Sequence, residues 1–368
     1  MRIGVPKEIK NLENRVAMTP DQAGELVALG HEVLIEERAG ATAGFPDEQY
    51  AAQGARRVNA ADAWLSDLVV KVKEPVPEEY PYLRGQVLFT FLHLAAAARE
   101  LTTTLLDSGT TGIAYETVED AGGRLCLLTP MSAVAGNMAT LVGAWHLAKH
   151  NGGSGVQLGE VDGERHGKVL VIGDGVVGNH AAAVATGMGA EVTLLGRNEQ
   201  QLADYRRSAA EWPRYLWSEP ERIAELIVDA DLVVGAVLMR GARAPHVVSE
   251  AMVRTMKPGS VIVDVAIDQG GCVETARPTT HEAPVYLAHG VIHYCVTNMP
   301  GAYPHTATRA LTAATFPYVK KLVQSGLGAL REDPGLARGL NTYQGRITCM
   351  EVAQALQLTD RYQAFSGT

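Results

Sequence analysis

The chain has 368 residues, a formal net charge of -9 at pH 7 and a sequence pI near 5.7. The negative charge argues against nucleic acid or an anionic membrane as a partner, so small molecules are the expected ligands. A chain of this length exceeds the size at which a single hydrophobic core stops growing, and we therefore expect two domains.

The cysteines and the first residues indicate a reducing compartment. Cys126, Cys272, Cys295 and Cys349 form no CxxC pair and have no metal-ligand spacing, which predicts neither a disulfide framework nor a metal site. The first ten residues, MRIGVPKEIK, mix charges into the sequence and have no apolar core, so we expect no signal peptide. A cytoplasmic protein fits both observations.

The first part of the chain alternates short apolar runs with helical patterns, which is typical of βαβ units around a parallel sheet. One helix has clear ends, with Thr19 as N-cap, Pro20 at the first helical position and Gly30 just past its end. The strands predicted here are Arg2–Val5, Glu32–Glu36, Leu68–Lys73, Val87–Leu92 and Thr111–Glu116.

The middle of the chain has a stretch without charged residues, from Leu125 to Ala148. Its length would span a bilayer, but Pro130 interrupts it and small and polar residues are frequent. We interpret it as the end of a strand, Arg124–Pro130, followed by a helix buried between the domains. The polar, Gly-rich segment 150–167 that follows is the best candidate for a hinge or domain boundary.

The second half repeats the βαβ pattern and ends in a long helix, roughly 305–324, with a tail that we expect to pack on the first domain. The predicted fold is α/β, with two Rossmann-like doubly wound parallel-sheet domains separated by a cleft: residues 1–128 plus 305–368, and residues 129–304. The strands predicted in this half are Lys168–Gly173, Glu191–Leu195, Asp231–Val237, Ser260–Ala266 and Val291–Val296.

A glycine motif in residues 168–198 predicts dinucleotide binding. Gly173, Gly175 and Gly178 stand in G-x-G-x-x-G spacing after a predicted strand, and a small-residue helix and a second strand follow them. The glycines allow the tight turn, the approach of backbone to a pyrophosphate and close packing of helix on strand, while the helix start, with Val177, receives the phosphate charge. A glycine turn used only for packing is the alternative.

The ribose-reading position departs from the usual motif. An acidic residue normally ends the second strand, about 20 residues on, and binds the ribose 2′-hydroxyl. This chain has Gly196 followed by Arg197, so we expect no carboxylate there to repel a 2′-phosphate. NADP(H) binding is then compatible with the sequence, while NAD(H) binding with Arg197 over the adenine stays open.

Titratable residues follow several predicted strands. Lys73 follows an apolar run, as do His93 and Asp268. Ligands of open α/β sheets bind beyond the carboxyl ends of strands, so these residues are expected to face a common cleft. Lys71 is expected to snorkel or pair within the protein, whereas Lys73 is expected to have an anionic ligand as its partner.

Several motifs resemble the alanine dehydrogenase and pyridine nucleotide transhydrogenase family over essentially the full length. They are MRIGVPKEIKNLENRVAMTP, VKVKEP, LFTFLHLAA, GIAYETV, TPMSAVAG, GAVL, VIVDVAIDQGGCVET and NMPGA. The resemblance implies Arg15 and Lys73 as ligands of a substrate carboxylate, and His93 and Asp268 as the catalytic pair. It also implies a set of residues that line the nicotinamide and ribose: Ser132, Val237, Leu238, Ile267, Asn298 and Met299.

The implied reaction is reversible oxidative deamination of L-alanine to pyruvate and ammonium with NAD(H), the family's usual dinucleotide, in a homohexamer. Imidazole exchanges protons close to neutral pH, which suits His93 to acid-base work. A related enzyme acting on another small 2-oxo acid, or forming a secondary amine, stays open. A dinucleotide-binding subunit like that of transhydrogenase is a further alternative from a different class.

Overall fold

The computed structural model describes residues 1–207, 211–237 and 244–366, and the chain divides into two compact units. Unit 1 comprises Met1–Met131 and Gly301–Thr368, and unit 2 comprises Ser132–Pro300. Each unit is built on its own sheet, so each is described by itself.

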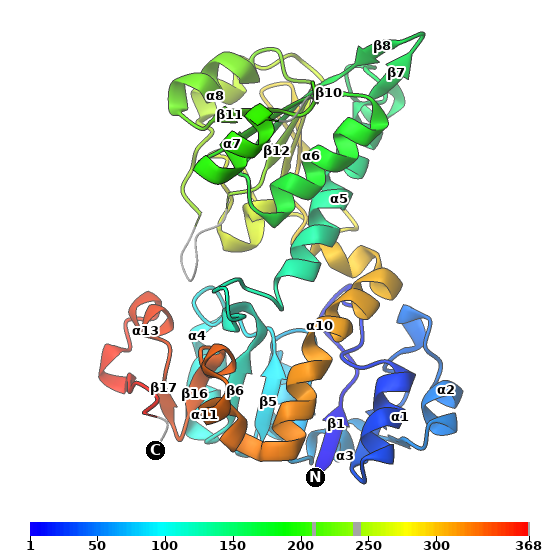
Figure 1. Ribbon diagram of the computed structural model, residues 1–368, viewed down its shortest axis with the longest axis vertical. Helices are drawn as coiled ribbons and strands as arrows, with labels where there is room; N and C mark the ends of the chain where they lie inside the picture. Colours follow the sequence, from blue (N-terminus) through cyan, green and yellow to red (C-terminus); the bar gives the residue numbers. More distant parts are fainter. Residues whose placement is uncertain (208–210, 238–243, 367–368) are drawn as a thin grey trace. The chain divides into compact units, whose positions relative to one another are not determined.

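Unit 1 contains an eight-stranded sheet in the order β17-β16-β6-β5-β4-β1-β2-β3 (Figure 1). The strands from β6 to β3 are parallel, whereas β16 and β17 from the C-terminal part add to the β6 edge as antiparallel strands. The C-terminal segment therefore packs on the first unit, as predicted. The strands are β1 (Arg2–Val5), β2 (Glu32–Glu36), β3 (Arg56–Val58), β4 (Leu68–Val70), β5 (Val87–Thr90), β6 (Thr111–Ala114), β16 (Leu340–Tyr343) and β17 (Arg346–Ile347).

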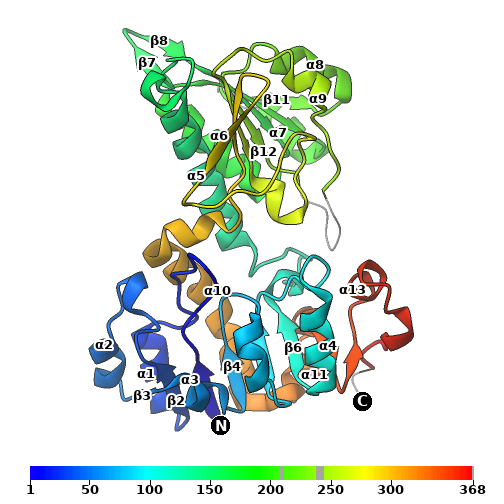
Figure 2. The same ribbon diagram turned by 180° about the vertical axis from the view of Figure 1, so that it is seen from behind.

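Helices cover both faces of this sheet (Figures 1 and 2). Leu101 and Leu105 of α4 and Val352 of α13 pack with Leu88 of β5 in one buried cluster. The long helix α10 lies on the face that Figure 1 shows in front. The helices of this unit are α1 (Pro20–Ala28), α2 (Asp47–Ala52), α3 (Ala60–Trp64), α4 (Arg99–Asp107), α10 (Pro304–Ser325), α11 (Ala329–Glu332), α12 (Pro334–Ala337) and α13 (Met350–Ala355).

Unit 2 contains a seven-stranded sheet in the order β11-β10-β9-β12-β13-β15-β14. All neighbours are parallel except β14 and β15, and the order reverses between β9 and β12, as in a doubly wound sheet. The strands are β9 (Lys168–Ile172), β10 (Glu191–Gly196), β11 (Arg214–Trp217), β12 (Leu232–Gly235), β13 (Val261–Asp264), β14 (Val285–Ala288) and β15 (Val291–Tyr294).

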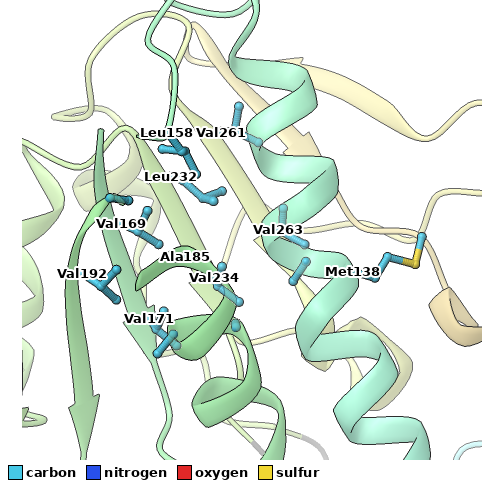
Figure 3. Packing of buried hydrophobic residues seen from close by; sticks show 14 of the residues in the cluster. Met138, Leu158, Val169, Val171, Ala185, Val192, Leu232, Val234, Val261 and Val263 are labelled. Atoms are coloured by element: carbon cyan, nitrogen blue, oxygen red, sulfur yellow. The ribbon is translucent and has the colours of Figure 1, made fainter. Parts of the chain in front are cut away.

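Two apolar clusters hold the helices of unit 2 on opposite faces of its sheet. Met138 of α5 and Ala185 of α6 pack with alternate strand residues such as Val171 and Val234 (Figure 3). The residues that alternate with these along the strands pack with α8 and α9 on the other face. The helices are α5 (Thr129–Leu147), α6 (Val176–Met188), α7 (Glu199–Arg207), α8 (Pro220–Ile227) and α9 (Glu250–Val253).

The predicted α/β class with doubly wound sheets is confirmed, and every strand predicted above from the βαβ pattern of the two halves is present. Most of them end earlier than predicted, because the apolar run continues past the last residue of the strand: Leu92 and Val296, for example, lie beyond the ends of β5 and β15. β4, for example, ends at Val70, before both lysines of the predicted strand. The predicted ends of the first helix are confirmed, with Thr19 as N-cap and Gly30 at a φ of 84° after its end.

Two predictions around the middle of the chain are wrong. Residues 124–130 form no strand: they run through a turn into α5, which begins at Thr129 because proline is readily accepted in the first turn of a helix. Segment 150–167 is not a unit boundary but lies inside unit 2, where Gly159–Val161 (β7) and Glu164–His166 (β8) pair as a hairpin. The units instead change at Met131, in the first turn of α5.

Within the described residues, no helix combines the length and apolarity needed to cross a membrane.

Candidate functional site

The chain places polar side chains just beyond the carboxyl ends of four neighbouring strands of unit 1. β1, β4, β5 and β6 are parallel and adjacent, so their ends meet at one edge of the sheet. Glu8 follows β1, Lys73 follows β4, His93 follows β5 and Glu116 follows β6. The sequence prediction named Lys73 and His93 at this edge but missed both glutamates.

Lys71 pairs within the protein, as expected. It is fully buried, and its Nζ lies 3.1 Å from Glu8 Oε2 and 2.7 Å from Glu79 Oε1. Burial alone would lower the pKa of Lys71, but the two carboxylates outweigh burial and raise it. Burial, opposed by Lys71, raises the pKa of Glu8 to about 7. This cluster holds the backbone in place, since Glu8 also accepts the N–H of Val72 at 2.7 Å.

Lys73 is 7% exposed and has a carboxylate beside it within the protein. Its Nζ lies 3.9 Å from Glu74 Oε2, and Lys10 binds the other oxygen of Glu74. Burial tends to raise the pKa of Glu74, but Lys73, Lys10 and His93 outweigh burial and lower it. Glu74 is therefore a partner for Lys73 within the protein, at a distance too long for a hydrogen bond, and the expected anionic ligand of Lys73 stays a prediction.

His93 is fixed by the end of the neighbouring strand. The Glu116 carboxylate accepts the N–H groups of Leu92, at 3.1 Å, and of His93, at 2.5 Å. His93 has a φ of 47°, which is uncommon for a residue other than glycine, and these two bonds help to hold that backbone. Its ring stacks on Phe91 with centroids 5.4 Å apart and an interplanar angle of 2°, and Nδ1 lies 3.9 Å from Glu116.

Arg15 is 2% exposed and is held by the neighbouring Glu13. Its Nε and Nη2 both donate to the Glu13 carboxylate, the Nε bond being 2.6 Å long, and Nη1 lies 2.9 Å from the Met131 sulfur. A planar guanidinium held by two parallel bonds has a fixed orientation. Glu13 was not predicted from the sequence, though it stands two residues before Arg15.

The glycine motif of unit 2 forms a cradle at the end of β9. A Cβ at Gly173 would lie 2.4 Å from the Ala236 carbonyl oxygen, and one at Gly178 would lie 1.7 Å from the Gly173 oxygen. Among the described residues no atom lies within 4 Å of a Cβ built at Gly175, which is the N-cap of α6. The outer glycines are therefore required for packing, while the space above Gly175 fits a pyrophosphate at a helix N-terminus.

The end of β10 carries a carboxylate that the sequence did not predict. Gly196 ends this strand, but the carboxylate of Asp174, the middle residue of G-x-G, reaches it from β9. Asp174 Oδ2 accepts the N–H groups of Arg197, at 3.1 Å, and Asn198, at 2.9 Å, and the hydroxyl of Tyr215. The premise that no carboxylate stands at this position is wrong, since sequence spacing does not show side chains that cross from one strand end to the next.

Asp268 lies in a turn that a second, buried aspartate organises. The Asp264 carboxylate accepts the N–H groups of Ala266, Cys272 and Val273, and burial raises the pKa of Asp264. Asp268 is exposed, and its Oδ1 accepts the N–H of Asn298 at 3.3 Å. This hydrogen bond joins the turn after β13 to the segment after β15.

The remaining predicted residues have varied burial in unit 2. Ser132 on α5, Val177 on α6 and Val237 after β12 are half-buried, and Ile267 and Met299 are buried. Leu238 lies outside the described residues.

Tyr215 and Asp174 are the clearest omissions of the sequence prediction for unit 2. Tyr215 belongs to β11, a strand that was not predicted, and burial raises its pKa to about 12, with a further contribution from its bond to Asp174. A charged residue in the middle of G-x-G is the sequence signal that could have identified Asp174.

The two sheets and the glycine cradle define a two-unit α/β protein with one unit of dinucleotide-binding form. The family models "Alanine dehydrogenase/PNT, N-terminal domain" and "Alanine dehydrogenase/PNT, C-terminal domain" match residues 4–135 and 139–350. The chain belongs to the alanine dehydrogenase/PNT family, which confirms the resemblance seen in its motifs.

Individual relatives agree with this assignment. The chain is 51% identical over 360 residues to an alanine dehydrogenase of Bacillus subtilis (strain 168), covering 97% of this chain and 95% of the relative. A solved L-alanine dehydrogenase is similar with a TM-score of 0.92 and 50% identity, over 97% of this chain and 99% of that one. A transhydrogenase structure from Sinorhizobium meliloti, at a TM-score of 0.79 and 24% identity over 95% and 99% of the two chains, shares the fold.

Proposed function

We propose that this protein is an alanine dehydrogenase, which converts L-alanine, water and an oxidised nicotinamide dinucleotide to pyruvate, ammonium and the reduced dinucleotide, and catalyses the reverse reaction. Full-length similarity to alanine dehydrogenases supports the proposal. The observation that carries it is the placement of Lys73 and His93 after adjacent parallel strands, each beside a fixed glutamate.

In unit 1, Lys73 and Arg15 bind the substrate carboxylate. Each charge-assisted hydrogen bond of this kind contributes roughly 1.5–3 kcal/mol. Glu13 keeps the guanidinium of Arg15 in one orientation, and Glu74 keeps the ammonium of Lys73 near the strand end. The substrate α-carbon is thereby oriented.

His93 transfers protons. Loss of a hydride from the α-carbon and a proton from nitrogen gives an imine, to which water adds, and the resulting carbinolamine expels ammonia. His93 donates and accepts the protons of these last two steps, and Asp268 stabilises positive charge on the nitrogen. Glu116 holds the backbone of His93 and so determines where its ring lies.

Unit 2 binds the dinucleotide, whose nicotinamide supplies the hydride-accepting chemistry when bound. Gly173, Gly175, Val177 and Gly178 form the pyrophosphate cradle, and Gly196 and Arg197 lie at the ribose end. NAD(H) is the proposed dinucleotide; the Gly196–Arg197 pair is the sequence feature that would favour NADP(H). The residues proposed to line the nicotinamide and its ribose are Ser132, Val237, Leu238, Ile267, Asn298 and Met299.

The direct test is oxidation of NADH followed by absorbance, with pyruvate and ammonium as substrates. We expect turnover that requires both, and no turnover with pyruvate alone. A panel of other 2-oxo acids, and of primary amines in place of ammonium, separates this activity from the related dehydrogenases. Preference for a primary amine over ammonium would contradict the proposal.

Self-association, as a homohexamer, is part of the proposal. Leu141 and Trp145 lie four residues apart on α5 and are 46% and 61% exposed, so they form an adjacent apolar pair that a second copy could cover. Light scattering coupled to size-exclusion chromatography measures the subunit number.

A further inference from the structure

The carboxylate of Asp174 occupies the place from which a side chain at position 196 would start. A Cβ built on Gly196 would lie 2.3 Å from both Cγ and Oδ2 of Asp174, and 2.3 Å from the Tyr215 hydroxyl. Glycine is therefore required at position 196 as long as Asp174 is present. The two positions belong to neighbouring strand ends, since Leu195 of β10 pairs with Ile172 of β9.

The Asp174 carboxylate is held by three donors that converge on one of its oxygens. Oδ2 accepts the N–H groups of Arg197 and Asn198 and the hydroxyl of Tyr215. In the part of the chain that the structure describes, no hydrogen bond is made to Oδ1. A hollow of about 830 Å³, lined by Asp174, Arg197, Asn198, Glu199 and Gln200, opens at this place.

We propose that Asp174 is the residue that reads the adenosine ribose and gives the protein its preference for NAD(H) over NADP(H). This inference rests on the dinucleotide-binding part of the proposed function. In the usual motif an acidic side chain at the end of the second strand accepts the 2′-hydroxyl, and here the first turn supplies that carboxylate instead. A 2′-phosphate would meet the negative charge of Asp174 at the same place.

Arg197 is fixed beside the carboxylate of Asp174. Its Nε donates to the carbonyl oxygen of Ser218 at 3.2 Å, and its backbone N–H is already bound to Asp174. Removing the Asp174 carboxylate would leave two N–H groups, a phenol hydroxyl and the guanidinium around one vacated space. Such a set of donors suits a phosphate. The loss of the Asp174 carboxylate should therefore weaken the binding of NADH and strengthen the binding of NADPH.

The experiment titrates NADH and NADPH separately against the full-length protein, with dihydronicotinamide fluorescence as the measure of binding and no substrate present. The wild type should bind NADH at least about 10-fold more tightly than NADPH, because a hydrogen bond to a charged group contributes roughly that factor or more. Asp174→Ala should weaken NADH binding by about 10- to 100-fold and tighten NADPH binding by about 10-fold.

Asp174→Asn preserves the shape and the acceptor for the N–H groups while removing the charge, and should shift the preference in the same direction. It keeps the test decisive if the alanine variant folds poorly, which circular dichroism would reveal. Glu219→Gln is the matched control, since it removes one exposed charge next to Ser218. An equal shift in this control would show a general charge effect and overturn the assignment of Asp174.

A second arm moves the carboxylate to the other strand. Asp174→Ala combined with Tyr215→Phe and Gly196→Asp removes the three nearest atoms that a Cβ at position 196 would meet. NADH preference should return in this triple variant, whereas Gly196→Asp alone should weaken binding of both dinucleotides. Failure of the triple variant to regain any preference for NADH would count against a ribose-reading carboxylate at this place.

The outcomes separate this inference from the proposed function. A wild type that prefers NADPH, or an Asp174→Asn variant with unchanged affinities, overturns the inference and leaves the alanine dehydrogenase activity standing. A wild type that binds neither dinucleotide overturns both. NADH binding that depends on Asp174, without turnover of pyruvate and ammonium, supports the inference and refutes the proposed reaction.

Discussion

Replacing Glu8 with glutamine removes one of the two carboxylates that surround the fully buried Lys71. Glutamine keeps an oxygen for the N–H of Val72, so the substitution chiefly removes charge. Burial is the main reason that the pKa of Glu8 is raised, and two carboxylates around one ammonium leave an excess negative charge in the interior. We therefore expect the effect of Glu8→Gln on stability to depend on pH.

The magnitude follows from the pKa of about 7 in the folded protein against an ordinary value of 4.5. One pKa unit corresponds to about 1.4 kcal/mol, so the raised pKa is worth about 3 kcal/mol of folding free energy. A raised folded-state pKa gives stability that is fully present below the unfolded value and is lost as the pH rises through 7. Between about pH 5 and about pH 8 the wild type should lose roughly 2–3 kcal/mol relative to Glu8→Gln.

The assay is the thermal midpoint of unit 1, measured for the wild type and for Glu8→Gln across this pH range. The difference between the two should change by roughly 5–10 °C in favour of the variant as the pH rises, given about 2–4 °C per kcal/mol for a domain of this size. Glu48→Gln, an exposed position on α2, controls for the loss of one charge. A constant difference would refute the reasoning, and a change that favours the wild type would show that Lys71 outweighs burial.

Three further predictions concern Glu116 and the glycine cradle. Glu116→Ala should lower kcat with pyruvate by about 10²-fold because His93 is misplaced, and the affinity for NADH should stay unchanged. Glu116→Gln should recover part of the lost activity, because glutamine keeps an oxygen that accepts the backbone N–H of His93. If both variants were as active as the wild type, Glu116 would not have this role. Gly178→Ala should destabilise unit 2 by roughly 3 kcal/mol or more in thermal unfolding, because its Cβ would lie 1.7 Å from the Gly173 oxygen. Gly175→Ala meets no described atom within 4 Å, so it should fold normally and weaken NADH binding; normal binding would place the pyrophosphate elsewhere.

The sequence was sufficient for the parts of the fold that depend on local pattern. Apolar runs gave the central parallel strands, and the G-x-G-x-x-G spacing located the cradle, since both depend on residues close together in the chain. β3, β11, β14, β16 and β17 were not predicted because strands at or next to the edge of a sheet carry a weaker apolar signal. Segment 150–167 looked like a boundary because hairpin turns and interdomain linkers share the same glycine-rich, polar composition.

The sequence predicts those residues of the candidate site that directly follow an apolar strand. Lys73 and His93 were identified in this way, but their partners Glu74 and Glu116 were not given roles, because a contact between side chains depends on strand order and register. The same limit applies to the end of β10. Gly196 at this end predicts no carboxylate, but Asp174, which follows the neighbouring strand β9, places its carboxylate there.

In the proposed function, Lys73 binds the carboxylate of a small amino acid or 2-oxo acid. Lys73→Met should lower kcat/KM for pyruvate by about 10²- to 10³-fold, because a buried charge pair loses one partner, while the affinity for NADH stays unchanged. Lys7→Met, a lysine at the same sheet edge after β1, should retain activity. The decisive measurement is kcat/KM for pyruvate in these two variants, and a Lys73→Met enzyme as active as Lys7→Met would contradict the account.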